Sequence, residues 1–176
     1  GADLTKASYF TPTFGGFQAG VSFYDSGAAG TTDSTSYGAS YTIDNLKIGY
    51  TNGMQEVASK GDNESQSLGA KLALGNATLI AAMSKVEGDD EDIDSIGFGA
   101  SYKVNADITV AASTMNSEDS LDLSGTEKEE LTQHMLEIKY QIAPGLAGYV
   151  NYTDYDYNNG GEASTDDDGA VTQFKI

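Results

Sequence analysis

The sequence contains no cysteine, no arginine and no tryptophan, and its only histidine is His134. The lack of cysteine excludes disulfide bonds, thiolate zinc sites and thiol nucleophiles. Nine lysines stand against 27 acidic residues, which leaves a formal net charge of −18. Because binding to phosphate backbones requires clustered basic residues, this balance argues against nucleic acid as a partner.

Long hydrophobic runs are also missing. The longest, residues 77–83, is far shorter than the roughly 20 residues that a transmembrane helix requires. The first residues, GADLTKASYF, do not form a signal peptide, so either one has been removed or the chain starts within a larger protein. Motifs of nucleophilic hydrolases, P-loop proteins, zinc proteases and dinucleotide-binding proteins are absent from the sequence. We therefore expect neither an enzyme nor a cofactor.

What the sequence does contain is an alternation of apolar and small polar residues. Tyr37, Ala39 and Tyr41 alternate with serine and glycine, and Ile96, Phe98 and Ala100 do the same further along. A period of two is typical of β-strands. The pattern predicts about eleven strands, at residues 4–10, 16–25, 35–43, 46–57, 65–74, 77–87, 93–104, 107–118, 131–142, 146–158 and 169–176.

The connections between these strands alternate in kind. One set is short and contains turn residues, for example Asp44–Asn45, Gly75–Asn76 and Pro144–Gly145. The other set is long and acidic, at residues 26–34, 58–64, 88–92, 119–130 and 159–168. Short turns at one end and long loops at the other are typical of an antiparallel up-and-down transmembrane β-barrel.

Residues 126–140 (TEKEELTQHMLEIKY) also fit a helix. Thr126 and Glu129 have the spacing of a capping box, and Leu131, Met135 and Ile138 have helical spacing. The strict alternation from Leu136 onward favours a strand.

Strand length and the composition of both faces favour lipid contact over a soluble core. Most of the strands are about nine to twelve residues long, which matches tilted membrane-spanning strands. The apolar face is rich in alanine and tyrosine and has less bulk than a soluble core usually needs. Four tyrosines lie where an aromatic girdle is expected, although tyrosine is also simply a good strand former: Tyr41, Tyr50, Tyr102 and Tyr140.

The lysines fall on the polar side of the alternation. In a barrel this side encloses water, so these lysines would line the lumen and influence ion selectivity. The alternative is that they are solvated and have no specific role. The pore-lining candidates, which include Glu137 as a neighbour of Lys139, are Lys6, Lys47, Lys71, Lys103, Lys139 and Glu137.

Calcium is the one metal that the acidic loops suggest. Carboxylates cluster at Asp89, Asp90 and Asp92, and Asp154 and Asp156 alternate in a DYDYNNG stretch that nearly fits a calcium loop. Its glycine is misplaced, and no glutamate follows at the required position. Solvated acidic loops without a metal are the alternative.

Several segments resemble the general porins of Gram-negative bacteria. The segment KASYFTPTFGGFQAGVSF (Lys6–Phe23) closely resembles a strand–turn–strand of these proteins, and LGAKLALGNATLIAAMS and IGFGASYKVNADITVAAS look like porin hairpins. The resemblance implies a trimeric barrel of about 16 strands in the outer membrane. It also implies passive diffusion of small hydrophilic solutes and contact with the bilayer and outer-leaflet lipid.

Two features depart from the family. An odd number of strands does not fit a bacterial single-chain barrel, so we expect one barrel domain over residues 1–176 that lacks about five strands before Gly1. The family also tends to end in an aromatic residue, whereas the last residues here are Phe174, Lys175 and Ile176, so the final residue is not aromatic. The alternative functions are a secreted, soluble acidic β protein that binds calcium or a surface partner, and a fibre-forming β protein.

Overall fold

The computed structural model describes residues 5–25, 33–57, 61–89, 92–120, 128–159 and 167–176. Within these residues the fold is all-β, as the alternation predicts. Eleven strands form one sheet. Their bounds are β1 Thr5–Phe10, β2 Phe17–Asp25, β3 Asp33–Ile43, β4 Leu46–Val57, β5 Gly61–Leu74, β6 Ala77–Glu87, β7 Asp92–Lys103, β8 Ile108–Asp119, β9 Glu129–Ala143, β10 Leu146–Asn159 and β11 Asp167–Lys175.

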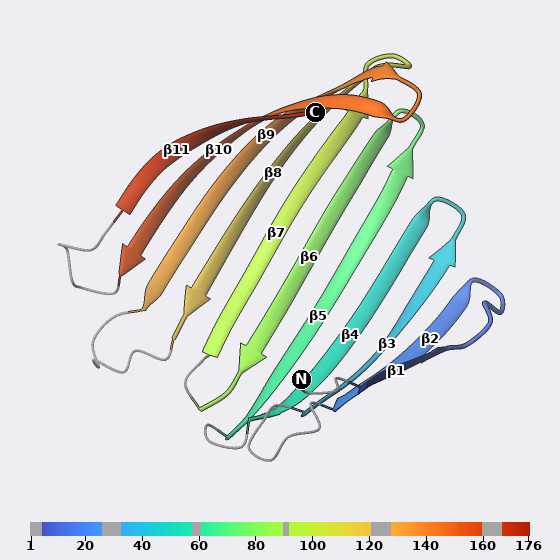
Figure 1. The fold of residues 1–176 in the computed structure, drawn as a ribbon, viewed down its shortest axis with the longest axis vertical. Coiled ribbons are helices and arrows are strands. Elements are labelled where there is room, and N and C mark those ends of the chain that lie inside the picture. Colours follow the sequence, from blue (N-terminus) through green and yellow to red (C-terminus); the bar gives the residue numbers. More distant parts are fainter. Residues whose placement is uncertain (1–4, 26–32, 58–60, 90–91, 121–127, 160–166) are drawn as a thin grey trace.

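Each strand pairs antiparallel with its neighbour in sequence, in the spatial order β1 to β11. Figure 1 shows the strands side by side, with the short turns at one end of the sheet. The opposite ends of the strands are those that the longer connections join in sequence. This up-and-down meander confirms the predicted topology.

The short turns form because their residues accept a left-handed backbone. Asp44 has a φ of 49° in the two-residue turn between β3 and β4. Gly145 has a φ of 83° after Pro144 in the turn between β9 and β10. Positive φ angles give tight hairpins a twist that matches the strands on either side.

The helical interpretation of residues 126–140 is wrong for the described part of that segment. β9 extends from Glu129 to Ala143 and pairs along its length with β8 and β10. Ladder pairing on both sides satisfies the backbone of β9, which outweighs the local capping and helical spacing. Thr126 lies outside the described residues.

Successive hairpins are staggered by about two residues. Phe17, the first residue of β2, pairs with Tyr41, two residues before the end of β3. Leu46, the first residue of β4, pairs with Leu72, two residues before the end of β5. Two residues correspond to about 7 Å along a strand, and two strands are about 9.6 Å wide across the sheet. The ratio of these two lengths gives the strands a tilt of roughly 35°. This tilt is that of a barrel wall.

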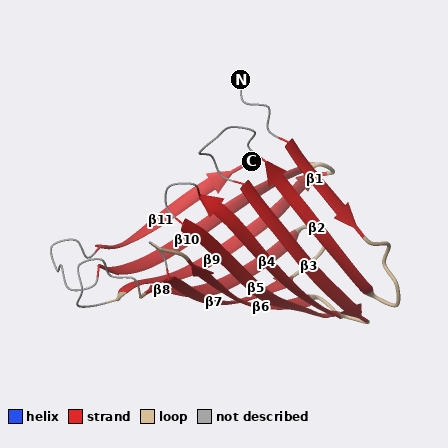
Figure 2. Cartoon of the chain, turned by 90° about the horizontal axis from the view of Figure 1, so that it is seen from below, coloured by secondary structure: helices blue, strands red, loops and turns tan. Residues whose placement is uncertain are grey.

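The described part of the chain has no hydrophobic core: none of its apolar side chains is buried. Figure 2 shows that the sheet is instead curved into an open trough. On β9, Leu136 and Ile138 are 58% and 53% exposed. Glu137 and Lys139, the residues that alternate with them, are partly buried. The polar side chains therefore converge on the concave face, and the apolar ones spread over the convex face.

The sheet is open in the described residues. β1 and β11 are its two edge strands and do not pair with each other. No helix in the described ranges is long and apolar enough to cross a membrane.

Candidate pore wall

The concave face is lined by small residues along β2 to β5. Cross-strand register places Gly20 opposite Gly38, Gly38 opposite Thr51, and Thr51 opposite Ser67. A hollow of about 490 Å³ lies over this surface. Because glycine has no side chain, and serine and threonine have short ones that carry hydroxyl groups, these residues leave the interior of the trough wide and easily wetted.

The convex face carries an apolar band with tyrosines near the short-turn end. Tyr41, Tyr102 and Tyr140 lie within three residues of the ends of β3, β7 and β9 and are 44 to 51% exposed. Tyr50 is on the same face but lies four residues into β4, farther from the turns. Three of the four girdle candidates therefore lie near one level, and Tyr50 lies above it.

The same face becomes polar toward the long-connection end. On β6, Met83 is followed on this face by Lys85, which lies opposite Asp94 of β7. The next pair is Glu87 with Asp92. The apolar band therefore ends partway along the strands, and beyond it the convex face carries charged side chains. The alternation alone did not predict this change.

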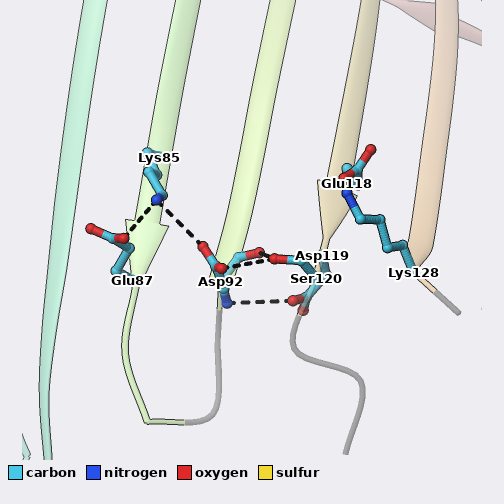
Figure 3. Close-up of polar contacts among 7 residues, drawn as sticks. All are labelled: Lys85, Glu87, Asp92, Glu118, Asp119, Ser120 and Lys128. Atoms are coloured by element: carbon cyan, nitrogen blue, oxygen red, sulfur yellow. Dashed lines mark hydrogen bonds and ion pairs between the residues drawn. The ribbon is translucent and has the colours of Figure 1, made fainter. Parts of the chain in front are cut away.

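A polar network connects the strand ends above the band (Figure 3). Lys85 Nζ lies 2.6 Å from Glu87 Oε1 and 3.7 Å from Asp92 Oδ1. Ser120 Oγ donates to Asp92 Oδ2 over 2.7 Å, and the amide of Asp92 donates to Asp119 Oδ1 over 3.4 Å. These contacts join β6, β7 and β8. The ion pairs of Lys85 are exposed, so they contribute local order rather than much stability.

Lys128, beside the start of β9, forms an ion pair with Glu118 of β8 (Figure 3). The hydrogen bond to Glu118 raises the pKa of Lys128 above the ordinary lysine value. Lys85 and Lys128, the two lysines of the convex face among the described residues, therefore both have acidic partners.

The predicted pore-lining residues all lie on the concave side of the register. Lys47 is directly opposite Lys71, and Lys103 and Lys139 both pair with Thr109. These lysines lie toward the short-turn ends of their strands. Lys6 is on the same face, opposite Tyr24, but at the long-connection end. The structure therefore brings four of the candidates toward one end and leaves Lys6 at the other.

Glu137 and Lys139 are two residues apart on this face but do not form an ion pair. Lys139 Nζ instead lies 5.6 Å from the centre of the Tyr149 ring on β10, within the range of a cation–π contact. Glu137 contacts Asn151, whose amide in its favoured orientation donates to Glu137 Oε2 over 3.0 Å. Both side chains point across to β10, which keeps their charges apart.

Comparison with known proteins identifies this architecture. The family model for Gram-negative porins matches residues 1–160. The chain belongs to the Gram-negative porins. These are outer-membrane proteins, and the sheet of this chain has the fold of a porin barrel wall. No curated protein matches the chain.

Solved porin structures share the fold of the chain at low sequence identity. The anion-selective porin from Comamonas acidovorans is 21% identical with a TM-score of 0.78, and the match covers 96% of this chain and 56% of that one. OmpT of Vibrio cholerae is 15% identical with a TM-score of 0.78, and the match covers 97% of this chain and 62% of that one. OpdQ of Pseudomonas aeruginosa is 13% identical with a TM-score of 0.74, and the match covers 99% of this chain and 58% of that one. The chain thus spans less than two thirds of the length of these structures.

Lys175 is a residue of this porin wall that the sequence pattern did not single out. It is the last residue of β11 and pairs with Tyr149, which in turn pairs with Lys139. Lys175 therefore lies on the concave face, in the same cross-strand row as Lys139. The alternation of residues 169–176 is too irregular to assign a face, and only the pairing with β10 does so.

The described part of the porin contains no group of three or more acidic or histidine side chains placed to hold a metal ion. Asp154 and Asp156 lie on the convex side of β10, opposite His134 and Thr132. Asp89 and Asp92 flank a segment that includes Asp90, which lies outside the described residues. Calcium binding by these residues therefore stays a prediction.

Proposed function

We propose that this chain forms most of the wall of a water-filled channel through the outer membrane, in which small hydrophilic solutes and ions diffuse passively. The observation that carries the proposal is the inverted exposure on β9. Leu136 and Ile138 are more than half exposed on the convex face, and Glu137 and Lys139 are partly buried on the concave one. In water this arrangement would be unfavourable, whereas in a bilayer it places apolar groups in hydrocarbon and charges in the lumen.

The proposal includes closure of the barrel by strands beyond the 176 residues. Two edge strands with unpaired backbone groups are not tolerated in hydrocarbon, and β1 and β11 are such edges. The chain covers only about three fifths of the solved porins that it resembles. We further propose a homotrimer, as the trimer form of OmpT of Vibrio cholerae suggests.

Diffusion through such a channel needs no catalytic residue and no cofactor, so we propose that the protein is not an enzyme. The only energetic requirements are a wet lumen and an apolar exterior. The soluble alternative lacks support in the described residues because none of their apolar side chains is buried.

The test is conductance. We expect the protein, as its gene encodes it and purified in detergent, to produce stepwise current increases in a planar bilayer and to make liposomes permeable to small sugars. The same preparation unfolded by heat is the control and should produce neither. A folded, monodisperse protein in detergent-free buffer would refute the proposal.

A further inference from the structure

We propose that five lysines of the concave face form one cationic belt near the short-turn end and make the channel prefer small anions to cations. The members of this lysine belt are Lys47, Lys71, Lys103, Lys139 and Lys175. The inference rests on the proposed channel function, and it names the class of solute that the channel favours. The chemistry that the belt recognises is a small negative ion such as chloride, inorganic phosphate or a carboxylate.

Cross-strand register places three of these lysines in one row. Lys103 pairs with Thr109, which pairs with Lys139. Lys139 pairs with Tyr149, which pairs with Lys175. Because these residues follow one another across β7 to β11 without a shift, their side chains leave the same face at the same position along the ladder.

The other two lysines lie near the same end of the wall because the hairpins are staggered. Lys47 is the second residue of β4, and its partner Lys71 lies three residues before the end of β5. Lys103 ends β7, and Lys139 lies four residues before the end of β9. Lys175 pairs with Tyr149, which lies three residues after the start of β10. All five therefore start within about 13 Å of the short-turn end of the wall.

The described residues provide no acidic partner for these cations. Lys85 and Lys128, on the convex face, both form ion pairs. None of the five belt lysines has a carboxylate oxygen of a described residue within the 4.0 Å limit of an ion pair. Glu137, an acidic residue on the concave side of β9, contacts Asn151. The positive charge of the belt is thus left for mobile ions to neutralise.

The belt and the net charge predict opposite selectivities. A formal charge of −18 by itself would draw cations into the lumen. A local belt of positive charge acts over about 8–10 Å at physiological salt and only about 3 Å at 1 M. Charges on the wetted wall act on ions inside the channel at close range, whereas distant charges are screened, so we expect the belt to dominate at low salt.

The experiment measures the reversal potential of the whole protein in a planar bilayer, with KCl at roughly 0.1 M on one side and roughly 0.3 M on the other. We expect chloride to permeate better than potassium. Replacing all five lysines by glutamine should lower the chloride-to-potassium permeability ratio by at least about threefold, and raising the salt on both sides should weaken the wild-type preference.

Two variants control for charge number and for folding. Lys85→Gln removes a lysine from the convex face and should leave the reversal potential unchanged. Replacing the five lysines by arginine keeps the charge and should keep the anion preference. A wild-type channel that prefers potassium, or a glutamine variant with an unaltered ratio, would overturn the belt while leaving the channel intact. Absence of any conductance would refute the proposed function instead.

Discussion

Lys47 and Lys71 lie directly opposite each other on β4 and β5, on the concave face of the sheet. Cross-strand partners have Cβ atoms only about 5 Å apart, and two like charges at that distance are destabilising. The wall nevertheless holds both at a position where serine or threonine would fit the pattern of the face. Such a stability cost fits the proposed role of these lysines in ion selectivity.

The first prediction concerns this pair. Lys71→Gln removes the repulsion from Lys47 and should raise the free energy of unfolding by about 0.2–1 kcal/mol. Denaturant unfolding of the protein refolded in lipid vesicles measures the change. Lys103→Gln is the matched control, because its partner Thr109 is uncharged, and it should produce no such gain. A less stable Lys71→Gln protein would contradict the interpretation.

The second prediction tests which face meets water. The sequence has no cysteine, so a single introduced thiol reports its own surroundings. Ala112 and Ser113 are adjacent on β8, with Ala112 exposed on the convex face and Ser113 on the concave one. In intact outer membranes a membrane-impermeant thiol reagent should label Ser113→Cys quickly and Ala112→Cys hardly at all. Faster labelling of Ala112→Cys would reverse the assignment of faces.

The third prediction concerns depth in the membrane. Ile138 lies within the apolar band of β9, whereas Thr132 lies on the same face in its polar part, opposite Asn116. A lysine at the midplane of a barrel's lipid face costs about 2–4 kcal/mol, and near the interface about 0–1 kcal/mol. Ile138→Lys should therefore destabilise the protein in vesicles far more than Thr132→Lys. Equal effects in the two variants would show that the band does not lie in hydrocarbon.

The fourth prediction concerns the polar network of Figure 3. Asp92→Asn weakens the contact with Lys85 and alters the acceptor of Ser120. Hydrogen–deuterium exchange should become faster at the long-connection ends of β6, β7 and β8, while ion selectivity stays unchanged. Asp94→Asn, on the same face of β7, is the control and should leave exchange at Ser120 as it is. A change in selectivity in Asp92→Asn would mean that the convex face acts on the lumen.

Much of the fold is predictable because apolar and polar residues alternate along each strand. The alternation around Ile96 and Phe98 located β7 to within one residue at each end. The same rule located β4 and β6 without error. Residues 126–140 were ambiguous because local capping and helical spacing compete with alternation there, and only pairing with β8 and β10 decides for the strand.

The candidate site was less predictable, because a side chain's neighbours lie on other strands. Lys175 has no clear alternating context, and its face follows only from its pairing with Tyr149. Glu137 was expected to accompany Lys139, but both residues instead contact side chains on β10. Asn52 occupies a position of the apolar phase, yet it is only 2% exposed and donates to Glu64 over 2.6 Å. Such a contact cannot be inferred from one strand alone.

By itself the sequence determined that this chain forms long two-faced strands joined by alternating short and long connections, because side chains of a β-strand point to opposite sides in turn. Only the tertiary structure decided which face is concave and which lysines share a level. Curvature of the whole sheet turns the polar face inward, and the stagger of about two residues per hairpin brings Lys47 and Lys139, far apart in sequence, to the same end of the wall.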